Sequence, residues 1–272
     1  MQGFQARPAD QAVSPFWPLP NDPIAVSAIA LSCLAALRGD DAELETWEAR
    51  ATKRAAEIGF PRGPFSLAFV KTYAAWSRRF RRDRETAQRL GAEIVEIGAS
   101  YGYAYWMALG ASYVGTAVPG EDADPDFLEQ NLATLRLIGH RAFTASNVAF
   151  LAELVAERGD LDRAAALIED AFDIMRKSGE YLHMPELLRL RAEYTLGRGG
   201  PTSEVVADLR EAASVAESQG AIVSRLRAAV ALARLPDDIR PADWRDVLTE
   251  VRSRVASVVS PDTADADACL AE

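Results

Sequence analysis

The sequence has few of the residues from which disulfides and transition-metal sites are built, because its 272 residues include two cysteines and two histidines. Cys33 lies in the first predicted helix and Cys269 in the C-terminal tail, so we expect no disulfide and a protein of the reducing cytoplasm. His140 and His183 lie far apart, each beside a predicted helix boundary. We interpret both as turn or packing residues and expect neither a metal centre nor a catalytic triad built on histidine.

Lysines, and the nucleotide-binding motifs that use them, are also scarce. None of the three lysines follows a glycine, which excludes the Gly-Lys-Ser/Thr motif of a phosphate-binding loop. No strand pattern precedes the glycine-rich run at 197–200, so a dinucleotide fingerprint is not indicated there. No stretch alternates polar and apolar residues between turns, as strands do. We therefore expect no enzymatic activity, no cofactor and no sheet.

Positive charge and long apolar runs are limited as well. The formal charge of −10 argues against a nucleic-acid partner or an anionic membrane surface. The most apolar stretches, 24–37 and 103–118, are shorter than a membrane span, so no transmembrane segment is expected. Residues 1–22 contain several prolines and charges where a secretion signal needs an apolar run, and they predict an extended lead-in.

Residues 144–179 instead show strong local order and predict two helices joined by a tight turn. Val148, Leu151 and Val155 share one apolar face of the first helix. Gly159 can end this helix, and Asp160 can cap the next one. The second helix has its own apolar face, formed by Ala164, Ile168, Ala171, Phe172 and Met175. This run is one helical hairpin.

Similar helix-ending glycines recur along the chain. They close the predicted second helices at Gly59, Gly98, Gly139, Gly179 and Gly220. From Gly59 to Gly220 is 161 residues over four intervals, a period of about forty, which is typical of two-helix solenoids. A hairpin cannot bury its apolar face alone, so copies should stack. We predict an all-α, right-handed solenoid of five to six helical hairpins of the tetratricopeptide-like (TPR-like) type.

The expected boundaries place one helical-repeat domain at 23–259, between the lead-in 1–22 and an acidic tail 260–272 that we expect to be disordered. A short amphipathic segment at 242–259 should cover the open end of the repeats. The expected helix pairs are 23–38 with 41–58, 64–80 with 83–97, 102–117 with 127–138, the hairpin within 144–179, and 185–196 with 204–219, followed by a helix at 222–235.

Five further segments are distinctive: WPLPNDP (17–23), FPRGPFSLAFV (60–70), YAYW (103–106), PELLRLRAE (185–193) and QGAIVSRLRAAVALARL (219–235). They resemble the C-terminal helical-repeat region of bacterial predicted-ATPase class III adenylate/guanylate cyclases and LuxR-type regulators, which are common in actinobacteria. The resemblance implies repeats that sense a ligand or partner and restrain an ATPase switch. It implies no catalytic activity for this chain, because these are packing motifs.

Two clusters are candidate binding residues. Arg78, Arg79 and Arg82 belong to the main basic cluster of an acidic protein, and they are either a solvated helix end or a dock for an acidic partner or a phosphate. The aromatic residues Tyr103 and Trp106, together with Tyr73, are either core or a ligand-stacking wall on the concave surface.

A third cluster, the acidic loop 122–126, alternates aspartates like a calcium loop. Phe127 and Ala133 replace the glycine and glutamate that such a loop needs, so a solvated acidic loop is the favoured interpretation.

The sequence thus favours a non-catalytic regulatory or scaffold module that binds a protein partner, or a parent ATPase domain, along its concave groove. The alternative is a sensor that holds a small-molecule effector in that groove. An inherited cyclase or ATPase activity is a weaker third hypothesis, because the phosphate loop is missing.

Overall fold

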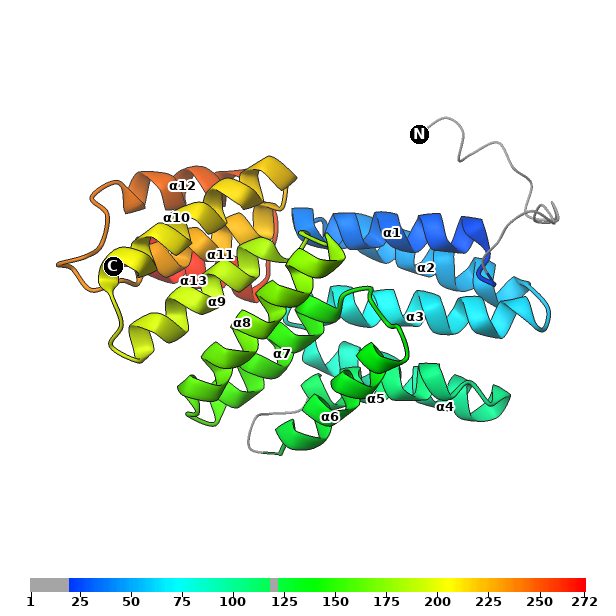
Figure 1. Cartoon of the computed structure of the whole chain (residues 1–272). Helices are drawn as coiled ribbons and strands as arrows, with labels where there is room; N and C mark the ends of the chain where they lie inside the picture. Colours follow the sequence, from blue (N-terminus) through cyan, green and yellow to red (C-terminus); the bar gives the residue numbers. More distant parts are fainter. Residues whose placement is uncertain (1–19, 118–121) are drawn as a thin grey trace.

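The computed structural model describes residues 20–117 and 122–272, and every regular element in these ranges is an α-helix (Figure 1). The all-α prediction is therefore confirmed for the described part of the chain. The helices are α1 (Pro23–Arg38), α2 (Asp41–Glu57), α3 (Arg62–Phe80), α4 (Arg84–Tyr101), α5 (Ala104–Ala117), α6 (Pro125–Leu137), α7 (Thr144–Glu157), α8 (Leu161–Ser178), α9 (Met184–Gly197), α10 (Thr202–Gln219), α11 (Ile222–Ala233), α12 (Trp244–Arg254) and α13 (Pro261–Ala271).

The local signals that predict the α7–α8 hairpin act as expected. Asp160 accepts a hydrogen bond from the backbone N–H of Arg163 and so caps α8, and Gly179 ends α8 in the left-handed conformation. The residues that define the two predicted apolar faces are all buried, Val148 and Ile168 among them. Most of the expected lead-in, with Trp17, lies outside the described residues.

The prediction that α4 ends at Gly98 is wrong, because α4 continues to Tyr101 and ends at Gly102. Gly98 is instead a contact point between helices: a Cβ atom there would lie 2.9 Å from the backbone nitrogen of Met107 in α5. A glycine inside a helix has the same appearance in a sequence whether it stops the helix or admits a neighbour.

The expectation of a disordered tail after residue 260 is also wrong. Residues Pro261–Ala271 form α13, which Ser260 and Thr263 start with a capping box. Ala266 and Cys269 are buried against α11 and α12, and Asp262 is only 2% exposed. The segment is small and acidic in composition, but its aspartates meet arginines of the folded chain.

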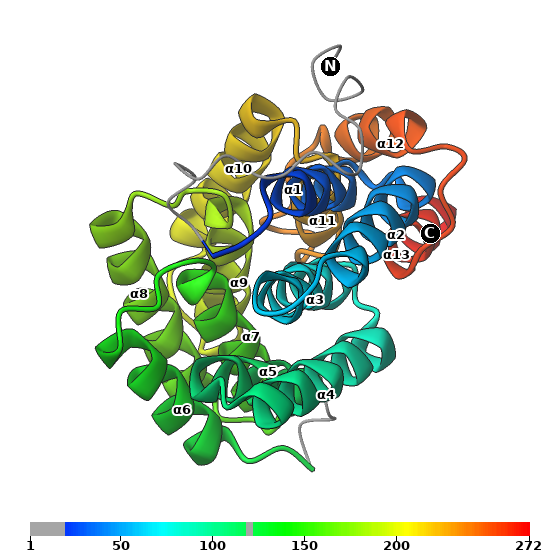
Figure 2. The same cartoon turned by 90° about the vertical axis from the view of Figure 1, so that its right-hand side faces the viewer.

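The helices wind around a common axis (Figure 2). The odd-numbered helices from α1 to α11 form an inner layer, and the even-numbered helices up to α12 lie outside them. The C-terminal end of α1 reaches the start of α11, since a Cβ on Gly39 would touch Val223. The first and last hairpins therefore meet after one turn.

Much of the inside of this turn is filled. Trp76 of α3 is fully buried, stacks on Phe143 with ring centroids 4.5 Å apart, and donates its Nε1–H to Ser146 Oγ of α7 at 3.0 Å. Phe80, at the end of α3, packs against His183. Side chains of α3 and α7 thus fill part of the space inside this turn. Within the described ranges, no helix combines the length and apolar character that crossing a bilayer requires.

Helices α4 and α5 approach most closely at two glycines, and this contact predicts a mutational effect. A Cβ at Gly110 would lie 2.7 Å from the carbonyl oxygen of Gly91. Gly110→Ala must therefore push the two helices apart, and we expect it to lower the free energy of unfolding by about 1–3 kcal/mol in urea denaturation. Gly59→Ala, where nothing lies within 4 Å, is the matched control and should change stability by less than about 1 kcal/mol. Equal effects of the two changes would contradict this description of the α4–α5 contact.

Candidate functional site

The main cavity lies on the concave side, between the C-terminal end of α3, the inner faces of α7, α9 and α11, and the first turn of α13. Its volume is about 920 Å³, which is within the usual size of small-molecule sites. One part of the wall is apolar and includes Leu190, Val230 and Leu235. The other part holds charged side chains from six helices, α3, α4, α7, α9, α11 and α13. We call this space the central cavity.

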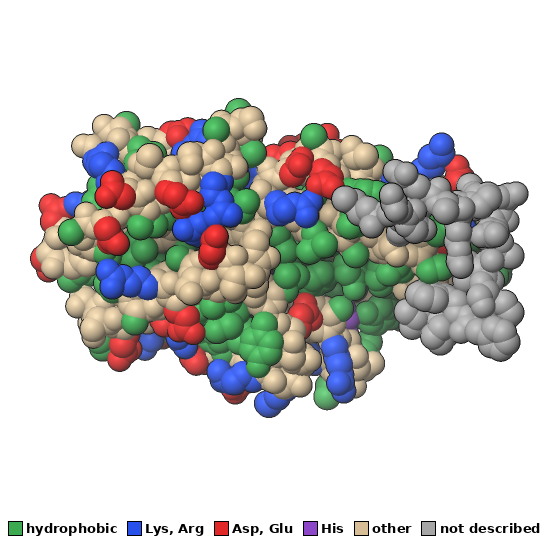
Figure 3. Space-filling view, turned by 90° about the horizontal axis from the view of Figure 1, so that it is seen from above, with side chains coloured by type: hydrophobic (Ala, Val, Ile, Leu, Met, Phe, Trp, Pro, Cys, Tyr) green, Lys and Arg blue, Asp and Glu red, His purple; other side chains and the backbone are tan. Residues whose placement is uncertain are grey.

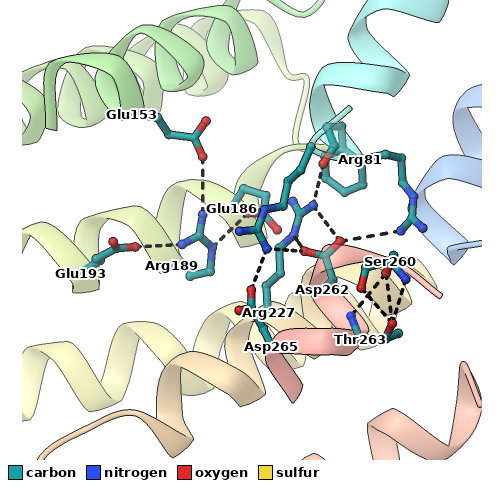
Figure 4. Close-up of polar contacts among 12 residues, drawn as sticks. Arg81, Glu153, Glu186, Arg189, Glu193, Arg227, Ser260, Asp262, Thr263 and Asp265 are labelled. Atoms are coloured by element: carbon teal, nitrogen blue, oxygen red, sulfur yellow. Dashed lines mark hydrogen bonds and ion pairs between the residues drawn. The ribbon is translucent and has the colours of Figure 1, made fainter. Parts of the chain in front are cut away.

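Arg189 of α9 lies at the centre of the charged wall (Figure 4). Its Nε–H donates to Glu186 Oε2 at 3.0 Å, and its Nη1–H donates to Glu193 Oε2 at 2.9 Å. Its Nη2 also lies 3.8 Å from Glu153 Oε1 of α7. Glu186 and Arg189 are one helical turn apart, so both point from α9 into the central cavity.

Arg227 of α11 connects three distant parts of the chain. It forms a bidentate pair with Asp262 of α13, at 2.8 and 3.1 Å, and donates to the carbonyl oxygen of Phe80 at 2.6 Å. Its Nη1 lies 3.5 Å from Glu186 Oε2. The guanidinium also stacks over the Phe80 ring, 4.7 Å from its centroid. Arg227 therefore ties α13 and the end of α3 to the last hairpin.

Arg79 of α3 completes the network from the opposite side. Its side chain is 3% exposed, donates to Glu153 Oε2 at 2.7 Å and to the carbonyl oxygen of Thr116 at 2.9 Å, and lies over the Phe150 ring. Because each of these buried guanidiniums has a carboxylate partner, the network is compensated as buried charges must be. The arrangement holds α3, α7, α9, α11 and α13 in fixed relation.

The protonation states follow from burial and from these partners. Burial acts to raise the pKa of Glu186, but Arg227 and Arg189 outweigh it and lower the pKa to about 2. Burial also acts to raise the pKa of Glu153, but the positive charges of Arg79 and Arg189 outweigh it, so that this pKa is lowered as well. Burial lowers the pKa of His183 to about 4, although the negative charges of Glu186 and Glu153 act to raise it. At neutral pH both glutamates are ionised and His183 is neutral.

This chemistry suits binding better than proton transfer. A general acid needs a pKa raised toward neutrality, and both glutamates are shifted the other way. Burial raises the pKa of the Cys33 thiol to about 12, so it is not a nucleophilic thiolate. The central cavity offers fixed charges of both signs beside an apolar wall.

The arginines predicted as a binding cluster are divided by the structure. Arg79 and Arg82 line the central cavity, whereas Arg78 faces away from it and pairs with Glu48 of α2 at 2.9 Å. Arg82 pairs with Asp265 at 2.7 Å, and Arg84 pairs with Glu157. The interpretation of this cluster as a solvated turn is wrong for Arg79, which is buried. It is no open basic patch either, because these arginines face carboxylates of the same chain.

Charges of both signs also alternate on the molecular surface. Figure 3 shows blue and red side chains next to one another over the face seen from above, with hydrophobic side chains gathered in its middle.

The predicted aromatic residues lie elsewhere, toward the starts of α3 and α5. Trp106 is 3% exposed and meets Phe65 edge to face, with ring centroids 5.1 Å apart. Tyr103 packs on Phe65 as well, and Tyr73 contacts Phe143. None of the three predicted residues lines the central cavity. Their packing agrees with the alternative that the aromatic cluster is core.

The remaining polar candidates have structural roles. Asp124 caps α6 by accepting the N–H of Phe127, and Asp126 pairs with Arg163 of α8 at 2.6 Å. His140 shares a 2.7 Å hydrogen bond with Tyr105. In the residues that the structure describes, no group of His, Cys, Asp and Glu is arranged to hold a metal ion.

The sequence did not identify the residues that dominate the central cavity. They are Glu153, His183, Glu186, Arg189, Arg227, Asp262 and Asp265. One signal was present in the sequence, since Glu153 and Arg227 are the charged residues within the apolar runs 148–156 and 226–233. No such signal was present for Asp262, because an aspartate in an acidic tail has no apparent partner in the sequence.

Comparison with known proteins finds no family model that matches this chain and no curated protein that is similar to it.

Proposed function

We propose that this chain is a non-catalytic regulatory module of TPR-like helical repeats that binds a small-molecule effector in the central cavity. The observation that carries the proposal is the cavity itself: about 920 Å³ in volume, with an apolar wall facing a wall of buried, fixed charges. Such a combination is typical of sites for molecules with an apolar body and a polar end.

The repeat architecture supports the regulatory part of the proposal. The hairpins recur about every forty residues, and the outer helices follow one another clockwise as they recede from the viewer in Figure 2, as in a right-handed superhelix. The five segments that resemble the repeat region of cyclase-linked and LuxR-type regulators fit a module that controls a partner ATPase. The lowered pKa values of Glu153 and Glu186 favour binding over catalysis.

A protein partner is the second candidate, and one observation favours it. Helix α6 packs on α5 and α7 and forms ion pairs with α8, and it carries or adjoins three exposed apolar residues, Phe127, Leu137 and Ile138, with Leu137 88% exposed. Such residues are common at protein interfaces.

A thermal-shift screen of the purified chain tests the first candidate against the second. The compounds are nucleotides, cyclic nucleotides, sugars, amino acids and organic acids. A cavity ligand present at 100 times its dissociation constant should add about 2.7 kcal/mol to the free energy of unfolding. For a chain of this size that is an increase of roughly 5–10 °C in Tm. If no compound stabilises the chain, the effector proposal fails and a protein-binding scaffold becomes the better account.

A further inference from the structure

The carboxylate of Asp262 occupies a binding site built from arginines. It is 2% exposed, forms a bidentate pair with Arg227, and lies 3.4 Å from Arg82 Nη1 and 3.8 Å from Arg81 Nη1. Asp265, one turn later, pairs with Arg82 at 2.7 Å and Arg234 at 2.8 Å. Four guanidiniums from the end of α3 and from α11 thus converge on two carboxylates of α13.

These carboxylates balance the local charge. Without α13, the four arginines would retain two partners nearby, Asp41 and Glu186, and this cluster beside the cavity would carry a net charge of +2. A planar guanidinium binds a carboxylate or phosphate of any origin with the same geometry. The residues that hold Asp262 would therefore hold a free anion equally well.

The helix that supplies these carboxylates depends on docking for its stability. Helix α13 has eleven residues, and its helix–helix packing is with α11 and α12. A helix of this length is not stable alone in water, so it exists only while it is docked. It follows an irregular segment in which Val259 is 95% exposed. The first turn of α13, with Asp262 and Asp265, forms one wall of the central cavity.

We propose that the guanidiniums of Arg81, Arg82 and Arg227 form a binding site for a small anion of the phosphate or carboxylate class, and that Asp262 of α13 is its built-in competitor. The inference rests on the proposed function in that it identifies the polar end of the cavity ligand as anionic. Binding of the anion displaces α13 from the mouth of the cavity, and undocked α13 reports the bound state to a partner. The competition is reciprocal, because two occupants of one site weaken each other equally.

Titration of the full-length chain with inorganic phosphate, at constant ionic strength, tests the site. Asp262→Ala should bind phosphate at least about tenfold more tightly than the unmodified chain. Asp267→Ala is the matched control, since Asp267 lies on the same helix but pairs with Arg252 of α12 and does not line the cavity. It should bind phosphate no better than the unmodified chain. Equal phosphate affinity in all three proteins would overturn the proposal.

A second variant and a second readout cover the case in which Asp262→Ala does not fold. Asp265→Asn removes a more exposed carboxylate from Arg82, one of the three arginines of the site, and should also tighten phosphate binding, by a smaller factor. In the unmodified chain, saturating phosphate should accelerate hydrogen exchange of the amides of α13 relative to those of α12. Unchanged exchange in α13 would count against displacement.

The two proposals can fail separately. A compound that binds the cavity of the unmodified chain without changing exchange in α13 would overturn the displacement and leave the effector function intact. If the compound screen yields no ligand while Asp262→Ala binds phosphate tightly, the anion site stands and the effector function fails.

Discussion

Arg227→Met is expected to lower the free energy of unfolding by about 3 kcal/mol, the lower end of the range for breaking a buried ion pair. The change removes the bidentate partner of Asp262 and the donor to the carbonyl of Phe80. The cost stays at the lower end because Arg82 and Arg189 still face the two carboxylates that lose Arg227. Equilibrium unfolding in urea, followed by circular dichroism, measures it.

Arg198→Met is the control for this change. Arg198 pairs with Asp162 at 2.7 Å, but its side chain is 46% exposed and that of Asp162 is 84% exposed. Exposed pairs of this kind contribute about 0–1 kcal/mol. If both variants lose stability to the same small extent, the buried network is not a major source of stability and α13 is not held by it.

Lowering the pH from about 6.5 to 4 is expected to reduce stability by about 3 kcal/mol through His183 alone, since its pKa falls from 6.5 to about 4 on folding. The unfolded chain binds the proton in this range and the folded chain does not. The stabilisation is therefore complete above pH 6.5 and is lost as the pH falls toward 4. The ring lies between Phe80 and Phe150 and is faced by Glu186, Glu153, Arg227 and Arg189.

His183→Phe isolates this contribution, because phenylalanine fits between the two rings and cannot be protonated. The difference in unfolding free energy between the unmodified chain and the variant should change by about 3 kcal/mol between pH 6.5 and 4. Carboxylates remote from His183 contribute equally to both proteins and cancel in the difference. Parallel pH profiles would show that His183 is protonated without penalty in the folded state.

The helices could be predicted because their signals are local. Apolar spacing around Val148 and Ile168, the capping aspartates before α2, α4, α6 and α8, and glycines such as Gly179 all act within a few residues of their own positions. The end of α4 was misplaced for the same reason. A sequence shows that Gly98 is a glycine but not that Met107 of the next helix lies against it.

The central cavity could not be predicted because its residues meet across the whole chain. Arg82 and Asp265 are 183 residues apart, and Arg79 and Glu153 are 74 apart. The period of forty predicts that hairpins stack, but it does not give the pitch at which α1 reaches α11. Because of that pitch, the end of α3 lies beside α11 and α13. The acidic tail, whose composition suggests disorder, therefore forms a docked helix.

The arginines of the chain also have a structural role, because many of them link helices to one another. Guanidinium groups remain charged when buried and bind carboxylates through two bonds, which lysine cannot do. Bidentate pairs link Arg54 to Asp22, Arg81 to Asp41, Arg191 to Asp208 and Arg227 to Asp262. Each joins different helices or a helix to its neighbour's cap, so the preference for arginine over lysine serves the packing of the helices.

The most direct test of the central claim is a calorimetric titration of the strongest stabilising compound into the unmodified chain and into Ala231→Trp. Ala231 lines the central cavity, and a tryptophan there occupies the space proposed for the effector. Ala207→Trp, on the exposed side of α10, is the control for introducing a large side chain. We predict one binding site per chain in the unmodified protein and in Ala207→Trp, and at least about a hundredfold weaker binding, equivalent to 2.7 kcal/mol, in Ala231→Trp. Equal affinity in all three proteins would contradict the account, because the effector would then bind outside the cavity.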